Sequence, residues 1–127
     1  MQEQINFSYR DFDSFARLRS SAVLVKCDDR LDAYFRRTCS VALGKEWDYV
    51  LRKASIEFLT SVELGTSMVQ YATPKRIGKT SFEIEYLFTK ESDPAIVASI
   101  VYVSVATEAM QKITTPANIR NFIEKLS

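Results

Sequence analysis

The second half of the chain constrains the fold most, because runs of alternating apolar and polar residues follow one another there. The runs are rich in β-branched and aromatic residues and cover residues 53–62, 67–75, 80–89 and 96–110. A period of two is typical of β-strands with one covered face. In the third run Phe82, Ile84 and Tyr86 share one face, and Glu83 and Glu85 share the other. We therefore expect an antiparallel sheet with one packed and one wet face.

The first part of the chain predicts a strand and then a long helix. Alternation over residues 5–9 indicates a half-buried strand. Residues 22–37 carry one apolar stripe at helical spacing, made of Leu24, Cys27, Leu31, Tyr34 and Phe35. Ser20 or Ser21 is expected to cap this helix, because a serine hydroxyl can accept a hydrogen bond from a first-turn amide. A short helical turn is expected around Trp47.

The end of the chain predicts a second, shorter helix. Thr115 is the expected cap, Pro116 suits the first helical position, and apolar residues then repeat at Ile119, Phe122, Ile123 and Leu126. The predicted order is strand, long helix, four strands and short helix. The most economical packing wraps the sheet around the apolar stripe of the long helix. We predict one α+β domain over residues 1–127.

Composition limits the partners and the location. The 127 residues include 17 basic and 16 acidic ones, and this net charge of +1 argues against a nucleic-acid partner. The longest apolar run, residues 95–106, is shorter than the roughly 20 residues of a membrane-spanning helix, and residues 1–7 lack a signal-peptide pattern. Cys27 and Cys39 fit neither a disulfide framework nor a metal site. We expect a cytoplasmic protein without a membrane span or a metal ion.

The chain contains no histidine, which narrows the possible chemistry. Ser-His-Asp and Cys-His nucleophiles and histidine-bound zinc are excluded within one chain. Acid–base chemistry therefore falls to carboxylates, lysine, tyrosine or cysteine. Asp11 and Asp13 precede the long helix, and from pattern alone such acids are commonly caps or turn residues. We interpret Asp11 as structural.

Three segments together resemble the hotdog-fold acyl-CoA thioesterases of the 4-hydroxybenzoyl-CoA thioesterase type. They are Asp11-Phe12-Asp13 before the long helix, residues 56–89 with Leu64-Gly65 and Gly78-Lys79-Thr80-Ser81 before successive strands, and the helix that starts near Pro116. The resemblance implies the hotdog fold, an antiparallel sheet wrapped around a long central helix. It also implies hydrolysis of an acyl-CoA or acyl-carrier-protein thioester, no cofactor, and a homodimer or homotetramer.

The same resemblance assigns roles around Asp13, the second acid of the Asp-x-Asp element. Its carboxylate would attack the thioester carbon or take a proton from water. The backbone amide at about Ser20 would hold the thioester oxygen as it gains charge. Family members usually carry glycine and histidine where this chain has Ala16 and Arg17. Arg17 or Arg19 is thus either a replacement carbonyl-polarising group or a side chain that fills the site.

Two further interpretations remain open. Lys75, Arg76 and Lys79 are candidate contacts for the phosphates of coenzyme A, since charged groups form strong hydrogen bonds with phosphate, and a solvated turn is the alternative. The replaced glycine and histidine also favour a second function, a non-catalytic hotdog protein that binds an acyl chain or a protein partner. Dehydration or hydration of an acyl thioester is disfavoured, because family members of that kind rely on histidine.

Overall fold

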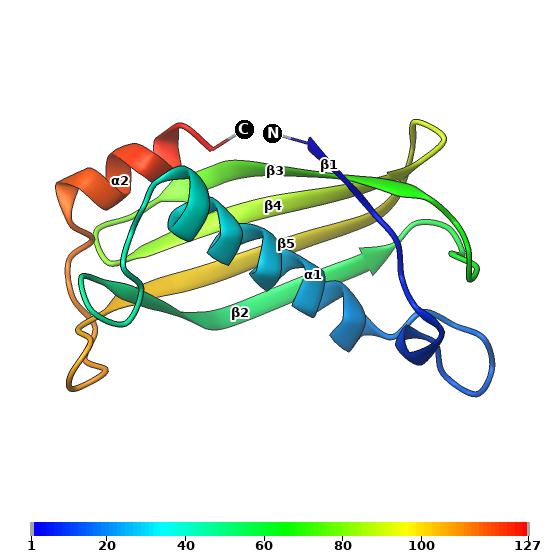
Figure 1. Ribbon diagram of the computed structural model, residues 1–127, viewed down its shortest axis with the longest axis horizontal. Helices are drawn as coiled ribbons and strands as arrows, with labels where there is room; N and C mark the ends of the chain where they lie inside the picture. Colours follow the sequence, from blue (N-terminus) through cyan, green and yellow to red (C-terminus); the bar gives the residue numbers. More distant parts are fainter. Residues whose placement is uncertain (1, 127) are drawn as a thin grey trace.

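The protein, analysed as a computed structural model that describes residues 2–126, is an antiparallel sheet with one long helix across its face (Figure 1). In chain order the elements are β1 (Gln2–Ile5), a 3-10 turn η1 (Tyr9–Asp11), α1 (Ser20–Ala33), a π-helical turn η2 (Tyr34–Thr38), β2 (Asp48–Phe58), β3 (Met68–Ile77), β4 (Ser81–Lys90), β5 (Asp93–Val105) and α2 (Ala117–Glu124). The strand order is β1-β3-β4-β5-β2, and all neighbours are antiparallel. The predicted α+β hotdog arrangement is confirmed.

The core lies between α1 and the inner face of the sheet. Alternate residues of β4 are buried there, and Glu83 and Glu85 occupy the opposite face as expected. From α1 and η2 the sheet covers Ala22, Val23, Cys27, Arg30, Leu31, Tyr34 and Phe35. The predicted stripe is therefore correct except at Leu24, which is only partly buried. The helix is turned slightly, so that a charged residue, Arg30, also faces inward.

Several predicted boundaries are wrong for identifiable reasons. Ser20 and Ser21 do not cap α1, because Arg19 occupies the N-cap position without a side-chain hydrogen bond. The first strand is β1, which ends at Ile5. No helical turn forms around Trp47; its ring is buried and β2 begins at the next residue.

The start of α2 also differs from the prediction. Pro116 is the N-cap of this helix, and the Thr115 hydroxyl instead shares a 2.7 Å hydrogen bond with Ser104. Among the strands, β5 is the longest with 13 residues, but β4 is the middle strand. The side chains of α2 that face the core are Ile119 and Ile123.

The two ends of the sheet differ in what covers them. At the end where β2 starts and β5 finishes, aromatic rings pack together, and we call this the aromatic end. Its rings are Phe35, Trp47, Tyr49, Phe82 and Tyr102, with centroid separations of 5.0 Å for Phe35–Trp47 and 5.4 Å for Phe82–Tyr102. The opposite end lies beside the start of α1 (Figure 1). No helix among residues 2–126 is long and apolar enough to cross a membrane.

Candidate active site

The segment between η1 and α1 folds as a tight hairpin, which we call the Asp13 hairpin (residues 11–19). Phe12 and Leu18 form an antiparallel bridge across it. The Asp13 N–H donates to the carbonyl of Arg17 at 2.8 Å, and the Arg19 N–H donates to that of Asp11 at 2.8 Å. Helix α1 begins at the very next residue, so the hairpin and the helix start form one unit.

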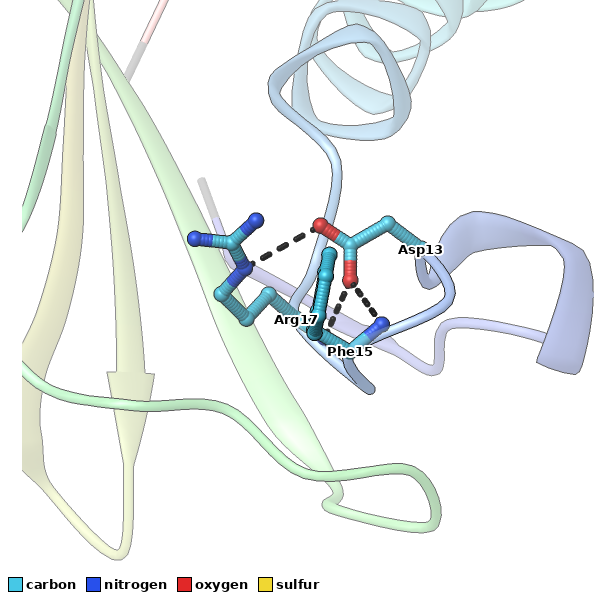
Figure 2. Close-up of polar contacts among 3 residues, drawn as sticks. All are labelled: Asp13, Phe15 and Arg17. Atoms are coloured by element: carbon cyan, nitrogen blue, oxygen red, sulfur yellow. Dashed lines mark hydrogen bonds and ion pairs between the residues drawn. The ribbon is translucent and has the colours of Figure 1, made fainter.

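The carboxylate of Asp13 is held by its own hairpin (Figure 2). Oδ1 accepts hydrogen bonds from the N–H groups of Phe15 at 2.8 Å and Arg17 at 3.0 Å, and Oδ2 accepts one from Arg17 Nε at 3.1 Å. The bond from the Arg17 backbone is the main cause that lowers the pKa of Asp13, with help from Phe15 and the Arg17 charge and against some desolvation. Asp13 is therefore ionised at neutral pH and fixed in orientation.

The turn of the hairpin depends on Ala16. Its φ of 60° lies in the left-handed region, which alanine enters at a cost of about 1 kcal/mol or more. The turn forms although residue 16 is alanine and not glycine. The hairpin keeps this backbone shape at some cost in stability.

Two hollows flank the Asp13 hairpin. The site hollow measures about 560 Å³ and is lined by Asp13 with neighbours that include Tyr9, Phe12, Arg19 and Leu64. The apolar hollow measures about 460 Å³ and is lined by residues that include Arg17, Leu18, Phe58 and Val62. The hairpin thus separates a space with both charged and apolar lining beside the carboxylate from a more apolar space beside the sheet.

The residues proposed from the sequence fall into two groups. Asp13 and Arg17 are joined by hydrogen bonds within the hairpin, whereas Ser20 follows the hairpin as the first residue of α1 and lines neither hollow. The Ser20 N–H bonds to no acceptor among residues 2–126, as is usual in the first turn of a helix, where the dipole is positive.

The proposed coenzyme A contacts lie at the other end of the molecule. Lys75 Nζ is 3.6 Å from Glu85 Oε2, and Arg76 Nε is 3.9 Å from Glu83 Oε1. Lys79 follows in the turn before β4. The register pairs this end of β3 with the aromatic end of the sheet, so one protomer does not bring these cations to Asp13.

Comparison with known proteins identifies the family. The family model described as the Thioesterase superfamily matches residues 24–97. The chain belongs to the thioesterase superfamily. The matched residues run from α1 into β5 and do not include the Asp13 hairpin, which precedes them. No curated protein sequence matches the chain.

Solved structures share the thioesterase fold at low sequence identity. The PA5185 protein from Pseudomonas aeruginosa strain PAO1 has a TM-score of 0.88 and 15% identity, over 100% of this chain and 91% of that one. Slr0204, a 1,4-dihydroxy-2-naphthoyl-CoA thioesterase from Synechocystis, has 0.83 and 16%, over 98% and 96%. A thioesterase from Thermus thermophilus, complexed with coenzyme A and Zn, has 0.83 and 21%, over 98% and 92%.

The thioesterase domain also contains hydrogen bonds between tyrosine hydroxyls and aspartates of α1 that the sequence did not predict. Tyr102 Oη donates to Asp28 Oδ1 at 3.3 Å and shares a 2.8 Å hydrogen bond with Tyr86 Oη, while Tyr49 Oη donates to Asp32. Burial is the main cause that raises the pKa of Asp28. From the sequence alone, Tyr86 and Tyr102 are interpreted as packing residues. The sequence feature that could have indicated these hydrogen bonds is the pair of acids, Asp28 and Asp32, which lie four residues apart beside the apolar stripe of α1.

A smaller hollow of about 270 Å³ lies between α1 and β2, and its lining includes Asp28, Asp32, Tyr49 and Tyr102. The hydroxyl and carboxylate groups there form two separate hydrogen-bonded sets, Tyr49 with Asp32, and Tyr86 and Tyr102 with Asp28. Among residues 2–126, no three cysteine, aspartate or glutamate side chains are arranged to hold a metal ion.

Proposed function

We propose that the chain hydrolyses an acyl-CoA or acyl-carrier-protein thioester, with Asp13 as the catalytic carboxylate. The observation that carries this proposal is the Asp13 hairpin, which holds an ionised carboxylate beside the start of α1 and along the site hollow. Membership of the thioesterase superfamily supports the reaction type. The coenzyme A in the Thermus thermophilus structure supports the carrier.

The hydrogen bonds of Asp13 leave it able to react. A carboxylate offers about four acceptor positions, and three of them are filled by Phe15 N–H, Arg17 N–H and Arg17 Nε. Oδ2 accepts only one of these bonds and therefore keeps a free lone pair. That lone pair can attack the thioester carbon or take a proton from an attacking water.

Charge that develops on the thioester oxygen needs nearby hydrogen-bond donors. The Ser20 N–H has no acceptor among residues 2–126 and lies at the positive end of the α1 dipole, and the Arg17 guanidinium is a second donor. The coenzyme A thiolate then leaves without a strong acid. If Asp13 is the nucleophile, the mixed anhydride it forms is hydrolysed by water, which returns the carboxylate.

We propose that the protein functions as a homodimer or homotetramer that pairs through β2. This edge strand has 11 residues, and Leu51 and Phe58 are 42% and 43% exposed. An open edge of this length is usually covered. Antiparallel pairing of two β2 strands about a two-fold axis would place the Asp13 hairpin of one copy beside the aromatic end of the other. Only with this pairing would Lys75, Arg76 and Lys79 of one copy lie near the Asp13 hairpin of the other, where they would bind the phosphates of coenzyme A.

We also propose a cytoplasmic location. Cys27 and Cys39 are both free thiols in the structure, as is usual for proteins in a reducing compartment.

The direct test measures free thiol released from a panel of acyl-CoA and acyl-carrier-protein substrates. Asn at position 13 keeps a carbonyl oxygen for the Phe15 and Arg17 amides, so Asp13→Asn should preserve the hairpin. We expect this variant to lose activity by about a hundredfold or more, and the exposed control Asp93→Asn to keep it. Equal turnover in wild type and Asp13→Asn would remove Asp13 from the mechanism.

One observation favours the alternative, a non-catalytic protein that binds an acyl chain or a partner. The Arg17 guanidinium lies against Oδ2 of Asp13, the oxygen with the free lone pair. The variant Arg17→Ala distinguishes a role of Arg17 in catalysis from a role in blocking the Asp13 carboxylate. If Arg17 polarises the substrate, its removal lowers the rate of hydrolysis; if it blocks the carboxylate, removal raises the rate. No turnover with any substrate in either protein would favour the binding role.

A further inference from the structure

The groove between β1 and α1 is lined by charged side chains that the proposed hydrolysis does not use. This β1–α1 groove measures about 690 Å³ and shares no lining residue with the site hollow or the apolar hollow. Its charged lining residues are Glu3, Lys26, Asp29, Arg30, Asp32, Arg36 and Arg37. The volume lies in the range of roughly 300–1,000 Å³ that is typical of small-molecule sites.

Arg30 lines this groove and lacks hydrogen-bond partners. Its side chain is 4% exposed, and its Nε and Nη2 atoms have no acceptor among residues 2–126. The opposite charge nearest in the structure is Glu3, whose Oε2 is 3.4 Å from Nε and whose side chain is 54% exposed. A buried guanidinium without hydrogen bonds is unfavourable, and such groups in native proteins nearly always have a partner.

The two unpaired nitrogens of Arg30 define what kind of partner fits. The N–H groups of Nε and Nη2 lie on the same edge of the guanidinium and point in parallel, which matches two oxygens of a carboxylate or phosphate. Glu3 approaches Nε without forming a hydrogen bond. An oxyanion that replaces the Glu3 carboxylate would meet both groups, and the Glu3 side chain is free to turn toward solvent.

Other cations surround the same groove. Lys26 lies one helical turn before Arg30, and Arg36 and Arg37 follow in η2. None of these three forms an ion pair with residues 2–126. The groove also contains Asp29 and Asp32, whose charges oppose an anion, so the attraction for a phosphate rests mainly on the unpaired guanidinium edge of Arg30 and on these three cations. A phosphate monoester carries about 1.5 to 2 negative charges at neutral pH.

We propose that the β1–α1 groove binds a phosphate group of a small molecule, anchored by Nε and Nη2 of Arg30. Lys26, Arg36 and Arg37 supply the remaining positive charge. Phosphate of this kind occurs on coenzyme A and also as free phosphate or on nucleotides. The site is separate from Asp13, so binding here does not depend on hydrolysis.

The test is calorimetric titration of the whole chain at constant ionic strength with inorganic phosphate, coenzyme A and dephospho-coenzyme A, which lacks the 3′-phosphate. We expect Arg30→Met to weaken phosphate binding about tenfold or more, because it removes charge-assisted hydrogen bonds. The exposed control Lys112→Met should bind as wild type does. Glu3→Gln should bind more tightly, because the competing carboxylate is gone.

The arms of the titration distinguish the source of the phosphate. Tighter, Arg30-dependent binding of coenzyme A than of dephospho-coenzyme A identifies the 3′-phosphate of the carrier. Equal Arg30-dependent binding of all three probes identifies a general phosphate site.

Two results would overturn the proposal. One is the absence of Arg30-dependent binding of every probe. The other is a Glu3→Gln variant that loses thermal stability and does not regain it with phosphate, since Glu3 would then be the true partner of Arg30. If Arg30→Met does not fold, the double variant Arg36→Gln, Arg37→Gln changes only exposed side chains. It should weaken binding about threefold or more, and unchanged affinity would equally contradict the proposal.

Discussion

The two ends of the sheet are built in opposite ways. At the aromatic end, Trp47 and its neighbours are buried by contacts between residues far apart in sequence. At the other end, the Asp13 hairpin satisfies its carboxylate within five residues and leaves Phe15 76% exposed. One end therefore supplies packing, and the other supplies a preformed polar group beside open space.

This contrast predicts that stability and activity can be changed separately. Substitutions in the aromatic end should change the free energy of unfolding, because they leave cavities in a packed core. Substitutions of side chains in the Asp13 hairpin that leave its backbone unchanged should alter turnover with little effect on unfolding.

The largest effect is expected for Trp47→Ala. Its ring is 1% exposed, and removal of a buried Trp side chain costs about 3–5 kcal/mol of stability. Phe15→Ala at the other end is the matched control and should change stability by less than about 0.5 kcal/mol. Urea unfolding measures both. Comparable losses in the two variants would show that the division is wrong.

The pH dependence of hydrolysis tests the Asp13 end directly. In the proposed mechanism the active form is the Asp13 carboxylate, whose pKa is lowered from the ordinary value, which is about 3.9 for aspartate. Activity should therefore stay constant as the pH falls from about 8 to about 5 and decline only below the ordinary aspartate range. Values of kcat measured over this range provide the check. A decline centred above about pH 5 would assign the reaction to another group, such as Asp28, whose pKa is raised.

Ala16→Gly should stabilise the protein by up to about 1 kcal/mol. Glycine adopts the observed φ of 60° without the steric penalty that alanine meets, and part of the gain is offset by the greater freedom of glycine in the unfolded chain. Thermal unfolding measures the difference. Ser14→Gly, at a neighbouring position without positive φ, should not stabilise. Destabilisation by Ala16→Gly would show that the hairpin does not strain this residue.

The smallest effect is expected for Asp28→Asn. Burial raises the folded-state pKa of Asp28 above its unfolded value, so the unfolded chain releases this proton first. Stability is therefore lost as the pH rises through the range between the two values. Asparagine removes that loss and keeps an acceptor for Tyr102. We expect a gain of less than about 1 kcal/mol at about pH 7 and none near about pH 3, and a loss at neutral pH would contradict it.

Much of the fold could be predicted from the sequence, because the spacing of apolar residues that indicates a strand or a helix is set by residues close together in the chain. The alternation of Phe82, Ile84 and Tyr86 is the observed inner face of β4. The position of β2 at the edge was not accessible, since it depends on pairing between β2 and β5. Trp47 was misassigned for the same reason, as long-range packing decides its conformation.

The candidate site shows the same limit. The resemblance pointed to Asp13, but nothing in the sequence predicted that the amides of Phe15 and Arg17 would hold its carboxylate. The expected serine cap failed because Arg19, fixed through its bond to Asp11, already takes the N-cap position. Side chains such as Lys75 could be named from the sequence, but the end of the sheet on which they lie required the strand register.

The titration of the buried groups has a consequence for control of the protein in a cell. Among residues 2–126, the shifted pKa values of Asp13 and Glu63 move down, those of the tyrosines and cysteines move up, and only that of Asp28 moves toward neutrality. With no histidine present, the electrical state of the hairpin stays the same when a cell acidifies under stress. Modest changes of acidity near neutral pH therefore leave the charge of this hairpin unchanged.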